Sequence, residues 1–268
     1  MLIIGIGGVG SWIAESLVRS GIGHILLLDL DDVCVSNINR QVHSTTSTVG
    51  AMKIDAMKNR LLDINPSCNI TLIHHFITSD NAYDTIKSIY TSNGNGITAC
   101  VDAIDQKFEK ASILSSCTKL SIPVMTIGSS AGRTDPTKII TADITKCEYD
   151  QLLKQTRKIL RQDYDFPKGA AQYMKQRKRK KTWNITAVYS NQLIPKEEMK
   201  DDHNDDDNIS TSSFRRCDNG YHGTASFVTG TFGFVTASCI VDRIVNDNLY
   251  PPMYNNTHLQ HIAQFDYV

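Results

Sequence analysis

The sequence predicts an α/β fold with a doubly wound, mainly parallel sheet. Three observations lead to this prediction. The apolar run at residues 2–6 leads directly into a glycine-rich loop and then into a helical pattern. Strand-length apolar runs alternate with helical patterns over residues 1–130, as is typical of parallel sheets. A later strand-like segment at 184–190 adds a C-terminal extension of the same sheet.

The first elements follow from simple sequence signals. A helix is expected at residues 11–20, where Gly21 and Gly23 end it, and a second apolar strand follows at 24–30. This order of strand, glycine loop, helix and strand is the first half of a Rossmann-like fold. The remaining expected helices are 49–64, 79–92, 109–120 and 234–245, and the remaining strands are 69–76, 97–104 and 123–127.

Composition limits the classes of function. The chain has 268 residues, with 21% charged and 41% hydrophobic residues and a formal net charge of zero. Binding to a polyanion would therefore need a local basic patch. The run from Lys175 to Lys181 is such a patch, and a solvated flank of the acidic segment behind it is an equally good interpretation. That acidic segment, residues 196–213, has few apolar residues and is expected to be a disordered insert.

Cysteine spacing and hydropathy exclude two further classes. The seven cysteines include no C-x-x-C pair, which argues against a tetrathiolate zinc site. The apolar stretch at residues 225–241 contains Thr, Ser and Gly, so we expect a buried core segment and no membrane span.

The glycine-rich loop predicts a nucleotide site. Gly5, Gly7 and Gly10 follow a strand and open a helix, and Gly8 lies between them. Glycines there permit a tight turn and close approach of phosphate to the helix N-terminus. Asp29 ends the second strand, where a ribose-binding carboxylate is expected. These residues alone are compatible with NAD, FAD or ATP.

Charged residues further along the chain favour ATP. Arg40 lies in the loop after the second strand, and Lys53 lies in the first turn of the next expected helix. Both cations can reach a triphosphate on the glycine loop and stabilise charge as a phosphate bond breaks. Asp102 and Asp105 lie at the carboxyl end of a central strand, where an acid can hold Mg²⁺ against phosphates.

The motifs GIGGVGS, DLDDVCVSNINRQ, VGAMK, INP and DAIDQ, in this order, resemble the ubiquitin-activating-enzyme superfamily with its ThiF and MoeB relatives. The resemblance implies an enzyme that joins a carboxylate to AMP with ATP and Mg²⁺. It also implies roles for individual residues, which are nucleotide contacts from Gly5, Gly7, Gly8, Gly10, Asp29, Asp31 and Asp102, phosphate contacts from Asn39, Arg40 and Lys53, and Mg²⁺ binding by Asp105.

Three further stretches narrow the resemblance, because ThiF and MoeB types usually carry zinc-binding C-x-x-C pairs. IPVMTIGSSAGRTDPTKI, RRCDNGYHGTASFVTGTFGFV and DDVCVSNINRQVHS resemble the tRNA threonylcarbamoyladenosine dehydratase family, the TcdA or CsdL type. This implies ATP-dependent cyclisation of threonylcarbamoyladenosine next to the anticodon of tRNA. The alternative acceptor is the C-terminus of a ubiquitin-like or sulfur-carrier protein. A dinucleotide-dependent oxidoreductase and an inactive nucleotide-binding scaffold are the other hypotheses.

The resemblance implies one adenylating domain over residues 1–268, with a nucleotide-binding half at 1–130 and a substrate and dimer half at 131–245. Cys217 matches a family cysteine that takes an acyl group in related enzymes, but cyclisation needs no thioester, which favours a structural role. His43 near Arg40 is also expected to be structural.

The expected partners are tRNA, a second copy of the chain and a sulfur-transfer protein. The expected location is cytoplasmic, or mitochondrion-associated in a eukaryote. Relatives usually have a segment before the first strand with a phosphate-binding arginine, so a start at Met1 predicts either an incomplete chain or a site with one cation fewer.

Overall fold

The computed structural model describes residues 1–94, 96–167, 182–194 and 223–246. They form one 7-stranded sheet in the order β3-β2-β1-β4-β5-β7-β6, in which all neighbours are parallel except β6 and β7. The strands are β1 (Leu2–Ile4), β2 (His24–Leu28), β3 (Asn69–Ile73), β4 (Cys100–Asp102), β5 (Val124–Ile127), β6 (Ile139–Asp143) and β7 (Thr186–Ser190). The predicted α/β fold with a doubly wound, mainly parallel sheet is therefore confirmed.

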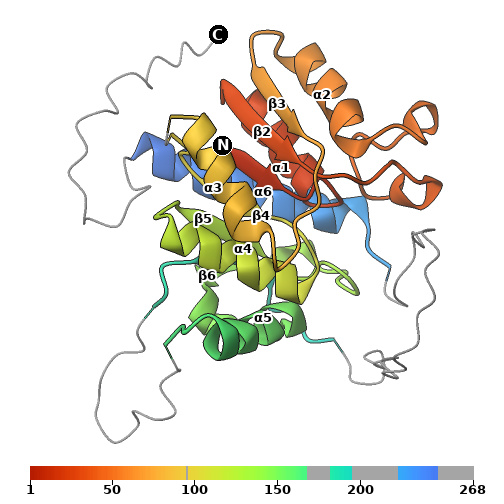
Figure 1. Ribbon diagram of the computed structural model, residues 1–268. Coiled ribbons are helices and arrows are strands. Elements are labelled where there is room, and N and C mark those ends of the chain that lie inside the picture. The colour runs from red at the N-terminus through yellow and green to blue at the C-terminus, as the bar shows by residue number, and fades with distance from the viewer. Residues whose placement is uncertain (95, 168–181, 195–222, 247–268) are drawn as a thin grey trace, which may run out of the picture.

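Helices cover both faces of this sheet (Figure 1). One face carries α1, α2 and α6, and the other carries α3, α4 and α5. The helices are α1 (Gly10–Arg19), α2 (Lys53–Ile64), α3 (Ala82–Ser92), α4 (Lys107–Lys119), α5 (Gln151–Asp163) and α6 (Ser226–Val245).

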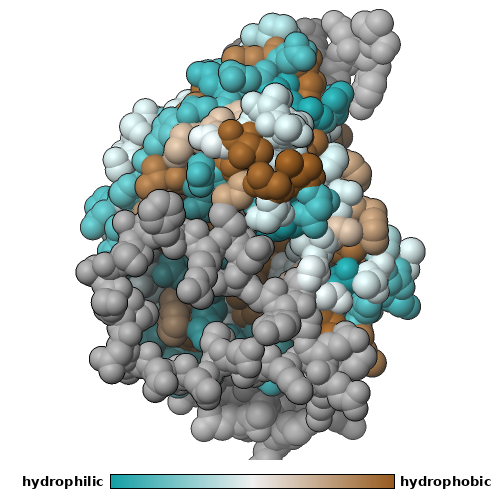
Figure 2. All heavy atoms as spheres, turned by 90° about the vertical axis from the view of Figure 1, so that its right-hand side faces the viewer, coloured by the Kyte–Doolittle hydropathy of each residue, from teal (hydrophilic) through white to brown (hydrophobic). Residues whose placement is uncertain are grey.

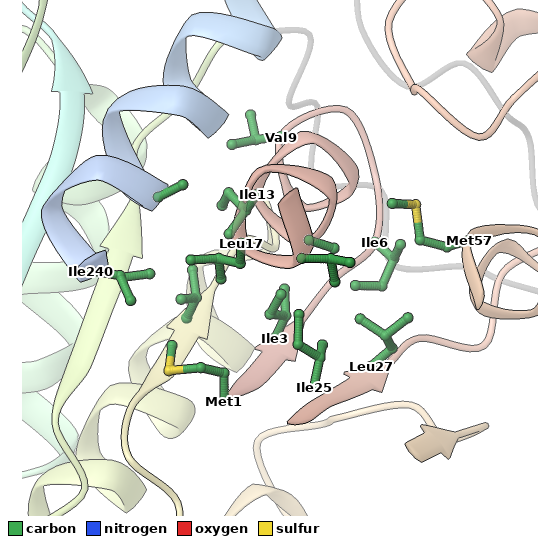
Figure 3. Packing of buried hydrophobic residues seen from close by; sticks show 14 of the residues in the cluster. Met1, Ile3, Ile6, Val9, Ile13, Leu17, Ile25, Leu27, Met57 and Ile240 are labelled. Carbon is green, nitrogen blue, oxygen red and sulfur yellow. The ribbon is translucent and has the colours of Figure 1, made fainter. Parts of the chain in front are cut away.

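The alternation of side chains along β1 separates two cores. Ile3 points to the α1 side, while Leu2 and Ile4 point to the α3 and α4 side. Figure 3 shows Ile3 below Ile13 and Leu17 of α1, with Ile240 of α6 beside them. Because β1 is apolar on both faces, it must lie in the centre of the sheet, and this burial fixes the position of the glycine loop that follows it.

The strand order reverses beside β1, which pairs with β2 on one side and with β4 on the other. The helices that follow these strands leave toward opposite faces, and ligands of open α/β sheets usually bind outside the carboxyl ends of the strands at such a point. The glycine-rich loop and the loop after β4 both begin at this switch point. The loop after β2 includes the short 3₁₀ turns Val35–Asn37 and Thr46–Thr48 and lies at the right in Figure 1.

Two elements were not expected from the sequence. β6 is an antiparallel edge strand, and α5 is an amphipathic helix that buries Leu153, Ile159 and Leu160. The expected strand at 184–190 is present as β7 and carries the C-terminal extension of the sheet. The expected insert at 196–213, the basic run from Lys175 to Lys181 and Cys217 lie outside the described residues.

α6 is the only helix of the described chain that is long and apolar enough to cross a membrane by length and composition. It packs along α1, and Val228, Phe232 and Ile240 are buried in the core on that side of the sheet. This packing agrees with the core segment that the sequence predicts there.

Candidate functional site

The glycine-rich loop turns sharply at Gly5 and enters α1 at Gly10. Gly5 has a φ of +87°, which side chains with a Cβ rarely adopt. A Cβ on Gly10 would lie 1.9 Å from the main-chain oxygen of Gly5, so the turn closes only with glycine there. The first turn of α1 contains no acidic residue. Its N-terminal N–H groups and the positive end of its dipole are thus available to an anion.

Asp29 fixes this loop to the end of β2. Its carboxylate accepts hydrogen bonds from the main-chain N–H of Ile6 at 2.6 Å and of Asp31 at 2.9 Å. Asp29 therefore lies at the switch point that the sequence assigns to it, and it also holds the loop in shape. Its predicted contact with a ribose stays a prediction.

Lys53 begins α2 and pairs with Asp31. Its Nζ lies 2.9 Å from Oδ2 of Asp31, and its main-chain N–H donates to the main-chain oxygen of Asp31 at 2.9 Å. The Lys53 side chain is 10% exposed, whereas that of Asp31 is 41% exposed. Since Lys53 is nearly buried and anchored at both ends, its ammonium has a fixed position beside the end of β2.

Arg40 lies over the glycine loop. A Cβ on Gly8 would lie 3.5 Å from Cγ of Arg40, so the arginine stem passes directly beside this glycine. Nη1 of Arg40 donates to the main-chain oxygen of Ser36 at 2.7 Å and to Oδ1 of Asn39 at 3.0 Å. Its Nε and Nη2 have no protein partner among the described residues. The guanidinium keeps two donor atoms for an anion on the loop.

Two residues that the sequence did not suggest hold the main chain of Arg40. Its carbonyl oxygen accepts hydrogen bonds from Nε1 of Trp12 at 3.0 Å and from Oγ1 of Thr229 at 3.1 Å. Thr229 belongs to α6 and is fully buried. The late sequence block that contains α6 therefore supports the nucleotide-binding half directly.

The segment before α6 crosses the same edge of the sheet. Nδ2 of Asn39 donates to the main-chain oxygen of Thr224 at 2.8 Å. The main-chain N–H of Gly132 donates to the main-chain oxygen of Gly223 at 3.1 Å. The loops after β2 and β5 are joined by two consecutive residues. Asn39 acts here as a bridge, and its predicted phosphate contact stays untested.

Asp102 takes a different position from the one that the sequence suggests. Its side chain is fully buried, and its Oδ2 accepts hydrogen bonds from Nζ of Lys110 and Oγ1 of Thr126, both at 2.7 Å. Burial raises the pKa of the Asp102 carboxyl, against the opposing effect of the Lys110 ammonium. Because the side chain is fully buried and these two groups occupy its Oδ2, Asp102 supports the end of β4 from within the protein. Direct contact with a nucleotide would require this pair to open.

Asp105 is exposed three residues further on, in the loop between β4 and α4. No hydrogen bond or ion pair joins its carboxylate to another described residue. It is thus the available acid at the carboxyl end of β4, in the place where the sequence expects a metal ligand.

His43 is the most unusual polar side chain near these cations. It is 2% exposed, and neither ring nitrogen has a hydrogen-bond partner among the described residues. Burial lowers the pKa of its imidazole to about 4, and the nearby Lys53 and Arg60 act in the same direction. The ring is therefore neutral at pH 7, and it adds no charge to the site.

The glycine loop at the switch point, with Arg40 and Lys53 fixed near the same end of the sheet, defines a Rossmann-type α/β protein with two cations where open α/β sheets bind ligands. The ThiF family model matches residues 1–266. The chain belongs to the ThiF family and, within it, to the tRNA threonylcarbamoyladenosine dehydratase family.

Relatives and solved structures agree with this assignment. The tRNA threonylcarbamoyladenosine dehydratase of Haemophilus influenzae is 39% identical, over 91% of this chain and 84% of that protein. That of Escherichia coli is 35% identical, over 91% of this chain and 85% of that protein. The crystal structure of the Escherichia coli enzyme in complex with ATP superposes with a TM-score of 0.72 and 32% identity, covering 92% of this chain and 86% of that one.

Proposed function

We propose that the protein catalyses ATP-dependent dehydration of threonylcarbamoyladenosine next to the anticodon of tRNA. The observation that carries the proposal is the position of Arg40 beside Gly8, in a chain whose overall fold is similar to that of a dehydratase solved with ATP. Arg40 beside the glycine loop and Lys53 beside the end of β2 suit a reaction in which negative charge develops on phosphate.

The proposed chemistry has two steps. An oxygen of the threonyl carboxylate attacks the α-phosphorus of ATP, and the bond to pyrophosphate breaks. The neighbouring ureido group then attacks the acyl-adenylate carbonyl, which closes the ring and expels AMP with the former carboxylate oxygen. Arg40 and Lys53 lower the repulsion between carboxylate and phosphate, and the second step is intramolecular, so positioning supplies much of its rate.

Mg²⁺ is part of this proposal. The ion usually takes one or two carboxylates together with phosphate oxygens, and Asp105 is an exposed carboxylate without a protein partner. Among the described residues no group of three or more His, Cys, Asp or Glu gathers around one point, so a cage made only by protein is not offered. Asp105 fits the role of a single anchor, and the bound ion would neutralise charge on the phosphates.

An oxygen-labelling experiment tests the reaction. Threonylcarbamoylated tRNA with ¹⁸O in its threonyl carboxylate is incubated with ATP, Mg²⁺ and the protein, and nucleosides and AMP are analysed by mass spectrometry. The expected result is loss of one water from the nucleoside and transfer of one label to AMP. Unlabelled AMP, or an unchanged nucleoside, would contradict the proposal.

Variants connect the reaction to the site. Arg40→Ala and Lys53→Ala are expected to abolish AMP release, whereas Lys58→Ala on the same helix as Lys53 serves as the matched control. Asp105→Asn is expected to raise the Mg²⁺ concentration needed for half-maximal rate, with Asp63→Asn as its control. Near-normal turnover in Arg40→Ala and Lys53→Ala would refute these roles.

A pyrophosphate-exchange assay separates the alternative acceptor. Pyrophosphate exchange that depends on a small protein with a Gly-Gly C-terminus, and not on tRNA, would assign the chain to carrier-protein activation.

From the family resemblance we also infer a homodimer, a sulfur-transfer protein as a second partner, and a cytoplasmic or mitochondrion-associated location. Exposed Phe227 and Phe234 on α6 are apolar surface that a second copy can cover, and light scattering of the purified protein tests the dimer.

A further inference from the structure

Tyr149 has an unusual backbone conformation and an exposed ring. Its φ is +59°, in the left-handed region that bulky residues rarely adopt. Its side chain nonetheless stands in solvent, with 55% of the residue exposed. Burial of the ring therefore does not account for this conformation, and strained residues of this kind cluster at binding sites.

A buried arginine holds the main chain of Tyr149. Nη2 of Arg133 donates to the main-chain oxygen of Tyr149 at 2.7 Å, and Nη1 donates to that of Gln192. Arg133 is only 4% exposed, and its Nε is buried without a partner among the described residues. The buried Arg133 side chain thus connects Tyr149 to the segment that follows β7, and burial of its charge is costly unless such hydrogen bonds are made.

The next residue fixes the same segment to β5. The carboxylate of Asp150 accepts hydrogen bonds from the main-chain N–H groups of Ser129 and Leu153, both at 2.9 Å. A Cβ on Gly128 would lie 2.2 Å from Oδ2 of Asp150, so glycine is required for this contact. Tyr149 is consequently presented on a rigid base at the carboxyl ends of β5 and β7.

This base lies on the same edge of the sheet as the proposed ATP site. Gly132, which precedes Arg133, bonds to Gly223, and Asn39, which precedes Arg40, bonds to Thr224. Consecutive Cα atoms are about 3.8 Å apart, so the two loops meet across one peptide unit. β5 is two strands from β1, which corresponds to about 10 Å along the edge.

We propose that Tyr149 is a stacking platform for a base of the single-stranded anticodon loop, and that Arg133 is its positioning residue. The inference rests on the proposed function, in which a carboxylate several bonds from a purine must reach the glycine loop. The purine or its neighbour then lies further along the edge, toward β5. RNA-binding proteins commonly stack the unstacked bases of single-stranded loops on exposed aromatic side chains. Figure 2 shows the face of the molecule that lies on the right-hand side of Figure 1, the side of the loop after β2.

RNA binding tests the platform directly. A fluorescein-labelled anticodon stem–loop with threonylcarbamoyladenosine is titrated with the full chain, and anisotropy gives the Kd. Tyr149→Ala is expected to weaken RNA binding about 5- to 100-fold and to leave the Kd for ATP unchanged. Tyr149→Phe keeps the ring and should stay within about twofold of the parent. Tyr83→Ala, an exposed tyrosine on α3, is the matched control.

Arg133→Lys tests the positioning role. Lysine keeps the charge but cannot reproduce the two-pronged geometry, so RNA binding should weaken while ATP binding is retained. If this variant fails to fold, the Tyr149 pair still decides the proposal.

Several results would overturn the platform. They are an unchanged RNA Kd in Tyr149→Ala, an equal loss in Tyr149→Phe, which would indicate a hydroxyl contact, and a change of oligomeric state in Tyr149→Ala. Nucleoside mass spectrometry keeps the two proposals separate. RNA binding through Tyr149 without dehydration refutes only the proposed function, and dehydration with a normal RNA KM in Tyr149→Ala refutes only the platform.

Discussion

The indole N–H of Trp12 donates a hydrogen bond to the main-chain oxygen of Arg40 at 3.0 Å. Trp12 is in α1, which the glycine loop opens, and Arg40 lies in the loop after β2. The same oxygen accepts from Thr229 of α6 at 3.1 Å. The position of the arginine over Gly8 is thus set by two helices that are far apart in the sequence.

Removal of the indole N–H should therefore impair catalysis more than folding. Trp12→Phe keeps an aromatic ring in the contact with Phe234 but loses the bond to Arg40. One such hydrogen bond is worth about 1 kcal/mol, so kcat/KM for AMP formation should fall about fivefold. Trp183→Phe, remote from Arg40, is the control. An unchanged kcat/KM in Trp12→Phe would show that Arg40 does not depend on this bond.

Substitutions at two glycines of α6 test how closely this helix packs against Trp12. A Cβ on Gly233 would lie 2.5 Å from Cβ of Trp12 and 3.1 Å from the main-chain N of Ile13. A Cβ on Gly230 would lie 3.8 Å from the indole, which is ordinary contact. We expect Gly233→Ala to lower the free energy of unfolding by about 1–3 kcal/mol or more, because α1 and α6 must separate.

Gly230→Ala should do the opposite. It adds a methyl group without overlap and reduces the backbone freedom of the unfolded chain, so the free energy of unfolding should rise by about 0.5–1 kcal/mol. Urea denaturation of both variants measures the two signs. Destabilisation of equal size in both would mean that the spacing between the helices is not set at Gly233.

The buried pair behind β4 predicts a large effect on stability. Asp102 and Lys110 are both fully buried, with 2.7 Å between Oδ2 and Nζ. Lys110→Met leaves the Asp102 carboxyl buried without its cation, and loss of one partner of such a pair costs about 3–5 kcal/mol. Asp55→Asn removes one partner of the exposed Asp55–His74 contact and should cost less than about 1 kcal/mol. Denaturant midpoints of the two variants should differ accordingly, and similar midpoints would contradict the buried charge.

The sequence predicted the first half of the fold because each element there has a local signal. Glycines mark the turn after β1, Pro66 follows α2, and apolar runs mark the central strands. β6 has no such signal, since it is an edge strand with Ile140 exposed and is defined by pairing to β7, about 45 residues later in the chain. α5 buries Leu153, Ile159 and Leu160 at helical spacing, but its remaining residues are mostly charged or polar, so its apolar signal is weak in the sequence.

Some residues of the candidate site could likewise be predicted from the sequence, and others could not. Arg40, Lys53 and Asp105 follow from motif spacing, because the strand ends place them at one edge. Thr229 and Trp12 do not, because their contacts to Arg40 depend on how α6 packs on α1. The pairing of Asp102 with Lys110 was also not predictable from spacing, since eight residues separate them and the contact requires α4 to fold back on β4.

His43 predicts how stability depends on pH. Its pKa falls from 6.5 to about 4 on folding, since both ring nitrogens are buried without partners among the described residues. Between these values the unfolded chain binds a proton that the folded chain does not, so the free energy of unfolding rises with pH through this window. The contribution is about 3 kcal/mol at most, and it is lost as pH falls from 6.5 toward 4.

Replacement of this histidine by an apolar ring should remove that dependence. His43→Phe is expected to unfold with a smaller loss of stability between pH 7 and pH 4 than the parent, because no proton uptake then favours the unfolded chain. At pH 7 the variant should be at least as stable as the parent, since it avoids burial of two unsatisfied nitrogens. His74→Gln, at a half-exposed histidine, controls for the general effect of losing an imidazole. Urea unfolding over this pH range measures all three proteins, and parallel curves for His43→Phe and the parent would mean that His43 stays protonated or partnered in solution.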